Sequence, residues 1–188
     1  MKSYLKRKIP VIAGLAALLG ACGDSTEPIL IPLPEEPTQA TVYDFVTGDI
    51  LDPSAFDVIT RSRVRTDQVS GWDFVYFEDE ALGPVIVTRG SYFEDEDEQA
   101  GALVTTFPFD LVTEAPDEGY VIQEPVPIST GDVFVVRSRS DRAFGNLRCR
   151  RYGKFLVEVI DAELGALTFS HIVNPNCENR DLDAGGEP

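Results

Sequence analysis

The fold is set by two apolar runs near the C-terminus, Phe155-Leu-Val-Glu-Val-Ile160 and Leu167-Thr-Phe-Ser-His-Ile172, which flank the short loop Asp161–Ala166. Val, Ile, Phe and Thr are enriched in both runs, and apolar residues recur at every second position. This is the pattern of a strand with one buried face. The loop contains a glycine and is short enough to join neighbouring antiparallel strands. The sequence therefore predicts a β-hairpin over these residues.

The register of this hairpin follows from the apolar pattern, because a slip of one residue would turn every buried side chain outward. Pairing Val159 with Leu167 puts the apolar residues of both strands on one face. The other facing pairs in this register are Val157 with Phe169 and Phe155 with His171.

The same register continues outward to Cys149 and Cys177. Facing residues on neighbouring strands lie near the Cα separation of about 5.5 Å that a disulfide needs. We therefore predict a Cys149–Cys177 disulfide, which an oxidising compartment would permit. The alternatives are two buried thiols or a metal pair. A two-thiol zinc site would need further His or Cys ligands, and we predict no metal site.

The rest of the chain beyond Thr41 shows short β-type runs separated by Gly, Pro and Asp, and no long stretch with a helical period. The expected strands are Thr41–Val46, Phe56–Arg65, Trp72–Phe77, Val85–Arg89, Ala102–Thr106, Val133–Arg139, Leu147–Ile160 and Leu167–Val173. Short strands at this spacing predict one all-β domain over residues 41–178, an antiparallel sandwich-like fold or partly closed barrel.

The N-terminus has the organisation of an export signal. A basic start is followed by the apolar run Ile9–Gly20, which is shorter than the roughly 20 residues that a membrane-spanning helix needs. The run ends in Leu19-Gly20-Ala21-Cys22, which resembles the lipobox of bacterial lipoproteins. We expect residues 1–21 to be removed and Cys22 to carry the lipid, which anchors the protein in a membrane. The alternative is an ordinary cleavage site with a chance cysteine.

The segment after Cys22 predicts the membrane to which the lipoprotein is sorted and the conformation of the tether that joins the lipid to the domain. Gly23, where a retention signal would have Asp, fits export to the outer membrane of the cell envelope. Four prolines between residues 22 and 40 prevent a helix and favour an extended, lipid-anchored tether. The last residues, 179–188, are expected to form a flexible acidic tail.

The charge balance is strongly acidic, with 32 Asp and Glu against 16 Lys and Arg. The leader holds four of the basic residues and no acidic residue, so removing it leaves a net charge of −20. A nucleic-acid-binding protein needs a basic face to meet phosphates, so we exclude that class of partner.

Seven basic residues nevertheless lie close together, at positions 137, 139, 142, 148, 150, 151 and 154. Two interpretations remain open. One is an anion-binding patch for a carboxylate-bearing ligand or an acidic partner, formed by Arg137, Arg139, Arg148 and Arg150. The other is cross-strand pairing of these arginines with the acidic N-terminal strands.

Residue types that commonly drive catalysis are scarce, so we predict a protein that is not an enzyme. His171 is the only histidine and lies on the apolar face of the hairpin, which favours a core role over a ligand role. Carboxylate pairs that could hydrolyse glycosides are expected by chance among 32 acids. The run Glu94–Glu98 indicates a solvated acidic loop, with a weak divalent-ion site as the alternative.

Several ordered landmarks resemble HmuY-type haem-binding lipoproteins of bacteria. They are Tyr43-Asp-Phe-Val-Thr-Gly48, Phe56-Asp-Val-Ile-Thr60, Val64-Arg-Thr66, Phe109-Asp-Leu-Val-Thr-Glu-Ala-Pro116, Val135-Val-Arg137, Tyr152-Gly-Lys154, Thr168-Phe169 and Asn174-Pro-Asn176. The resemblance covers roughly residues 41–176 and implies an all-β envelope protein that captures haem and passes it to an outer-membrane receptor.

The resemblance implies a haem site that this chain fits only in part. Its best-known members ligate the iron with two histidines, whereas the mature chain has one histidine and no methionine. A haem site here would use a tyrosine or His171 as ligand and the arginines for the propionates. The alternative function is an accessory or structural subunit of a periplasm-facing membrane complex, without a small-molecule ligand.

Overall fold

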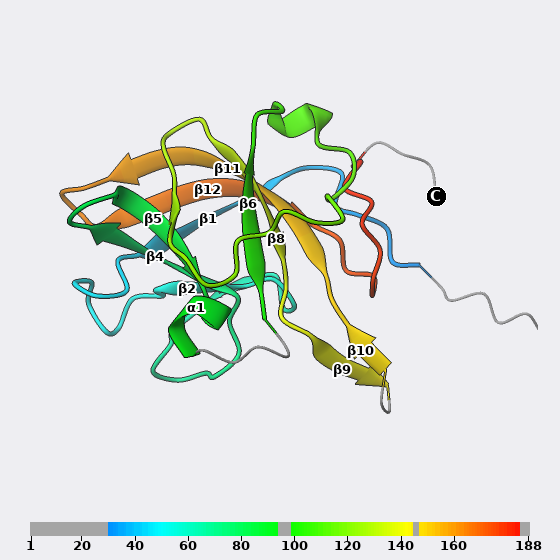
Figure 1. Cartoon of the computed structure of the whole chain (residues 1–188), viewed down its shortest axis with the longest axis horizontal. Helices are drawn as coiled ribbons and strands as arrows, with labels where there is room; N and C mark the ends of the chain where they lie inside the picture. The colour runs from blue at the N-terminus through cyan, green and yellow to red at the C-terminus, as the bar shows by residue number, and fades with distance from the viewer. Residues whose placement is uncertain (1–29, 94–98, 145–146, 185–188) are drawn as a thin grey trace, which may run out of the picture.

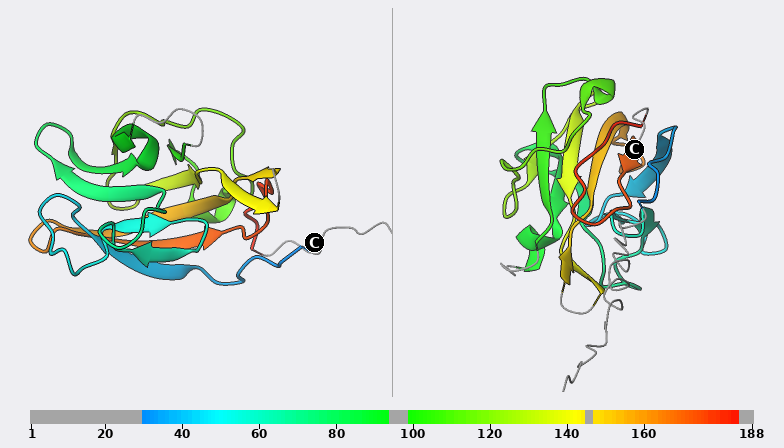
Figure 2. Two further views of the ribbon diagram at one scale, coloured as in Figure 1. Left: turned by 90° about the horizontal axis from the view of Figure 1, so that it is seen from below. Right: turned by 90° about the vertical axis from the view of Figure 1, so that its right-hand side faces the viewer.

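Two five-stranded antiparallel sheets face each other in the computed structural model, which describes residues 30–93, 99–144 and 147–184 (Figures 1 and 2). The first sheet has the order β1 (Thr38–Tyr43), β12 (Ala166–Val173), β11 (Tyr152–Asp161), β8 (Val133–Arg137) and β6 (Gly101–Thr105). The second has the order β3 (Ser62–Val64), β2 (Ala55–Asp57), β4 (Phe74–Asp79), β5 (Gly83–Thr88) and β7 (Val126–Pro127). The all-β, sandwich-like fold is confirmed.

Four smaller elements lie outside the two sheets. β9 (Asp141–Phe144) and β10 (Leu147–Cys149) form a separate two-stranded ribbon. Helical structure in the described residues is limited to the single turns α1 (Arg89–Phe93) and η1 (Phe109–Leu111). No helix in this part of the chain is both long enough and apolar enough to cross a membrane.

The core between the sheets is rich in phenylalanine. Its five phenylalanines are Phe56 and Phe74 from the second sheet, and Phe134, Phe155 and Phe169 from the first. Their contacting rings have centroids 5.0 to 5.8 Å apart, in stacked, tilted or edge-to-face pairs. Such aromatic pairs add to the stabilisation from burial alone.

The predicted hairpin is formed by β11 and β12, and its register is confirmed for most of its length. Phe155 faces His171, and Val157 faces Phe169. The predicted pairing of Val159 with Leu167 is wrong, because a β-bulge at Glu158 shifts the ladder by one residue and Ile160 faces Leu167 instead. The bulge turns Val159 to solvent, where it is exposed, while Leu167 stays buried.

Two predicted strands are interrupted in the structure. The run 56–65 divides into β2 and β3, because the carboxylate of Asp57 accepts hydrogen bonds from the Ile59 amide and the Thr60 hydroxyl and closes a turn between them. Arg61 takes the left-handed conformation in that turn (φ 57°). The run 147–160 divides into β10 and β11 at Arg150 and Arg151, which bond to other segments.

The predicted disulfide between Cys149 and Cys177 is present, with the two Cα atoms 5.1 Å apart. Cys177 lies beyond the end of β12, so the bridge is not a pair of the hairpin ladder. Backbone bonds from the Asn174 amide to the Tyr152 carbonyl (2.9 Å) and from the Glu178 amide to the Arg150 carbonyl (2.9 Å) bring the two segments together.

The domain extends further at both ends than the sequence predicted. Residues 179–184, expected as the start of a flexible tail, pack on the outer face of the first sheet, where Leu182 is fully buried and its amide donates to the Thr113 carbonyl (2.8 Å). At the other end β1 begins at Thr38, and Ile31 exchanges two hydrogen bonds with Asn176. The predicted leader, Cys22 and the first half of the tether lie outside the described residues, as do residues 185–188.

Candidate functional site

His171 fills space in the core between the sheets. It lies on β12, is 6% exposed, and its ring contacts those of Phe56, Phe155 and Phe169, with the Phe56 centroid 4.8 Å away. Burial lowers the pKa of His171 to about 4, so the imidazole is neutral at pH 7. An iron atom bound to this imidazole would have to lie inside the phenylalanine core. His171 therefore does not fit the role of a haem ligand.

This placement predicts the outcome of a haem titration. Haem added to the full-length protein should give the same absorption spectrum with the native chain as with His171→Phe, because the buried imidazole does not reach the iron. The measurement is the Soret region at micromolar protein. A Soret maximum that appears with the native chain and is lost in the variant would contradict the prediction.

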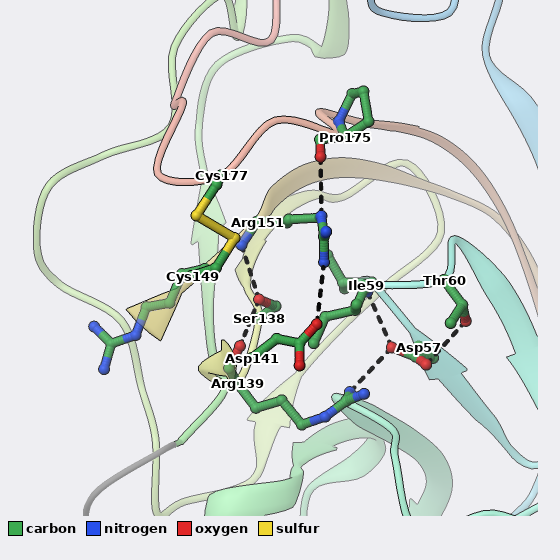
Figure 3. A network of polar contacts seen from close by, with 12 residues as sticks. Asp57, Ile59, Thr60, Ser138, Arg139, Asp141, Cys149, Arg151, Pro175 and Cys177 are labelled. Carbon is green, nitrogen blue, oxygen red and sulfur yellow. Dashed lines mark hydrogen bonds and ion pairs between the residues drawn. A yellow bond between two sulfur atoms is a disulfide. The ribbon is translucent and has the colours of Figure 1, made fainter. Parts of the chain in front are cut away.

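Arg139 is enclosed in an ion-pair network that joins the two sheets (Figure 3). Its Nη1 donates to Asp57 Oδ1 and Asp73 Oδ2, both at 3.0 Å, and its amide donates to Asp73 Oδ1 at 2.7 Å. Asp73 is fully buried, and burial raises its pKa to about 6. Gly71 leaves room for the guanidinium, because a Cβ there would lie 2.8 Å from Arg139 Nη2. Arg139 thus pairs with the acidic N-terminal strands, which was one of the two interpretations left open.

Arg151 and Lys154 hold the same region of the domain together. Arg151 Nε donates to the Pro175 carbonyl at 2.9 Å, and its amide donates to Ser138 Oγ at 2.9 Å (Figure 3). Lys154 is buried, and its Nζ donates to the carbonyls of Phe109 and Val112, which secures η1 against the sheet. Both side chains therefore stabilise the fold by donating hydrogen bonds to backbone carbonyls of other segments.

The other predicted anion-binding arginines do not gather around His171. The Arg137 guanidinium lies over the Tyr120 ring, 4.9 Å from its centroid. Burial, together with the nearby charge of Arg150, lowers the pKa of Arg137. Arg148 is on β10, and the Arg150 amide bonds to the Glu178 carboxylate (2.9 Å).

The acidic run 94–98 and the side chain of Arg142 lie outside the described residues. Among residues 30–93, 99–144 and 147–184, no three His, Cys, Asp or Glu side chains are grouped so as to hold a metal ion.

A different surface stands out at the end of the sandwich that we call the loop end, formed by segments 44–54, 78–83 and 161–165. Asp44 joins all three. Its Oδ1 accepts the amides of Val46 and Thr47 (2.8 and 2.7 Å), and its Oδ2 accepts the amide of Glu78 (2.9 Å). Its own amide donates to the Gly165 carbonyl (2.7 Å). Asp44 is only 4% exposed, and it links the three loops: its carboxylate joins segments 44–54 and 78–83, and its amide joins segment 161–165.

Each loop then presents apolar side chains to solvent on an Asp-capped turn. In four cases the amide of the exposed residue itself donates to the aspartate. The pairs are Val46 with Asp44 (2.8 Å), Leu51 with Asp49 (2.9 Å), Leu82 with Asp79 (2.8 Å) and Leu164 with Asp161 (3.0 Å). Together with Ile50, these side chains are 50 to 69% exposed. The turns hold the backbone that carries the apolar side chains, although those side chains have no core to fill.

A hollow of about 450 Å³ opens beside the first of these loops. Its walls include Phe45, Val46, Ile50 and Trp72, and its polar lining includes Asp49 and Asp67. It therefore combines aromatic and aliphatic walls with carboxylates, an environment suited to a side chain with an apolar stem and a cationic tip.

The loop end was not among the sites predicted from the sequence. A usable signal was present, because each turn contains an aspartate followed after two or three positions by a large apolar residue. Such pairs are common in turns, and only the fold shows that four of them meet at one end of the molecule.

No protein-family model, curated protein or solved structure matches this chain. The function is therefore inferred from the loop end and from the expected membrane anchor.

Proposed function

We propose that this chain is an exported, lipid-anchored, non-catalytic binding protein that contacts a partner protein through its loop end. It would act as an accessory subunit of a membrane complex in the cell envelope. From the resemblance to HmuY-type lipoproteins, the proposal takes the all-β fold and the location in the cell envelope. It does not include haem ligation by His171.

The observation that carries the proposal is a set of exposed apolar residues whose backbone amides donate hydrogen bonds to aspartate side chains. Exposed apolar side chains gathered on one surface commonly mark a binding site. Fixing them before binding lowers the entropy cost of association, and a few such anchors supply most of the affinity of a typical interface.

The position of the loop end supports the same proposal. β1 runs from Thr38, where the N-terminal segment arrives, to Tyr43, where the first loop of the loop end begins. The loop end and the N-terminal segment therefore lie at opposite ends of the sandwich (Figures 1 and 2). A domain anchored through Cys22 would present its loop end away from the membrane, within reach of a partner.

The test compares two leucines whose side chains have nearly the same exposed fraction, one at the loop end and one elsewhere. A photo-crosslinking residue, p-benzoylphenylalanine, replaces Leu164 (69% exposed, loop end) or Leu111 (66% exposed, on η1) in the full-length chain made in its native membranes. We expect a discrete cross-linked protein from position 164 and none of that mass from position 111. In the same chain, Leu82→Asp should lower the cross-link yield at least tenfold, because it places a charge in the apolar contact.

The folding of each variant is checked by its unfolding midpoint, since solvent-exposed positions rarely change stability by more than about 0.5 kcal/mol. Identical cross-link patterns from positions 164 and 111, or a yield unaffected by Leu82→Asp, would overturn the proposed function.

A further inference from the structure

Every charged residue of the loop end is acidic. Its three segments contain eight acidic residues and no lysine or arginine, the acidic residues being Asp44, Asp49, Asp52, Glu78, Asp79, Glu80, Asp161 and Glu163. Seven of the twelve basic residues of the mature chain instead lie between positions 137 and 154. The segments that carry the apolar anchors therefore bear charge of one sign, which must be satisfied when the surface is covered.

Four of these carboxylates have structural roles, because they cap the turns that carry the apolar residues. Asp52, Glu80 and Glu163 do not: within the described residues their carboxylates accept no hydrogen bond and join no ion pair. They stand beside Leu51, Leu82 and Leu164 respectively, separated from them by at most two positions in the sequence. Each of the three exposed leucines thus has, within two positions in the sequence, a carboxylate that the fold does not use.

We infer that the partner is a protein whose contact face has apolar pockets rimmed by lysine and arginine side chains. This inference rests on the proposed function and names the chemistry of the partner. The apolar side chains enter the pockets, and the unused carboxylates meet the basic rim. The hollow beside Phe45 and Ile50 receives one lysine or arginine of that rim, whose stem packs on the apolar walls while its charge meets Asp49.

Two other occupants of an apolar surface fit the charges less well. A phospholipid bilayer presents phosphates, which repel a surface whose charged groups are all carboxylates. A second loop end of the same chain would bring two acidic surfaces together, which costs free energy at every like-charge contact.

The experiment compares two sets of charge-removing substitutions in the full-length chain that carries the cross-linker at position 164. The loop set is Asp52→Asn, Glu80→Gln and Glu163→Gln. The control set removes three exposed charges elsewhere, Asp110→Asn, Glu118→Gln and Glu124→Gln. Both sets change the net charge equally, so a general electrostatic attraction would affect them alike.

We expect the loop set to lower the cross-link yield about tenfold at low salt and the control set to change it less than twofold. Raising the sodium chloride concentration to about 0.5 M should lower the native yield in the same way, because exposed charges are then screened. Mass spectrometry of the cross-linked peptide should locate a contact face in which lysine and arginine outnumber aspartate and glutamate.

The outcomes separate this inference from the proposed function. A cross-linked partner whose yield falls with Leu82→Asp but not with the loop set, or whose contact face is acidic, overturns the inference and leaves the proposed function standing. A cross-link to lipid or to a second copy of the chain overturns both.

Discussion

The Arg139→Met variant should unfold with a free energy about 3 to 5 kcal/mol below that of the native protein. Methionine keeps much of the apolar stem but removes the cation that pairs with Asp73, whose side chain is fully buried, and with Asp57, which is nearly so. A buried carboxylate without its counter-charge retains the full cost of leaving water. Urea denaturation at pH 7, followed by tryptophan fluorescence, measures the loss.

Two matched variants separate the buried charge from other effects of losing an arginine. Arg65→Met removes a similar ion pair, with Asp67, from a more exposed position, and should cost less than about 1 kcal/mol. Adding Asp73→Asn to Arg139→Met should recover part of the stability, because a neutral amide needs no counter-charge. Equal losses from Arg139→Met and Arg65→Met would contradict the role given to the buried pair.

The parts of the fold that were predictable from the sequence are those set by local alternation. The hairpin register up to the bulge follows from apolar residues at every second position and needed no knowledge of the second sheet. The disulfide was predicted by extending that register, and it is present although Cys177 lies beyond the end of the ladder. The bulge at Glu158 was not predictable in this way, because the strand keeps its apolar character on both sides of the inserted residue.

The candidate site could not be predicted from the sequence, because it is formed by contacts between segments far apart in the chain. Two interpretations were open for Arg139 in the sequence, an anion site and pairing with the acidic N-terminal strands. The structure selects the second, because Arg139 pairs with Asp57 and Asp73, which lie 82 and 66 residues away. The loop end similarly depends on Asp44, whose carboxylate reaches Glu78 and whose amide reaches Gly165. Apolar residues in turns are unremarkable in a sequence, and their significance follows only from their meeting on one surface.

The effect of pH on stability depends on two buried groups that act in opposite directions. The pKa of His171 falls from 6.5 to about 4 on folding, because burial disfavours the imidazolium. As the pH decreases from 6.5 to 4, the unfolded chain therefore binds this proton and the folded chain does not, so unfolding becomes easier. Burial raises the pKa of Asp73 from 3.8 to about 6, so the folded chain binds that proton first and unfolding becomes harder over nearly the same range.

In the native protein these two contributions offset each other, and His171→Phe should expose the one that remains. Phenylalanine suits a site already lined by three phenylalanine rings, so the variant should differ little from the native protein at pH 7. Between pH 6.5 and 4 the variant should gain stability relative to the native protein by about 3 kcal/mol, the free energy of a pKa shift of this size.

The measurement is the free energy of unfolding in urea at several pH values between 7 and 4 for both proteins, taken as a difference so that the many carboxylates they share cancel. Asp73→Asn provides the complementary variant, and its stability relative to the native protein should fall as the pH decreases over the same range. A constant difference between His171→Phe and the native protein would mean that the imidazole is protonated equally in the folded and unfolded chains. In that case His171 would have to be solvated, and its place in the phenylalanine core, with the argument against haem ligation that depends on it, would be wrong.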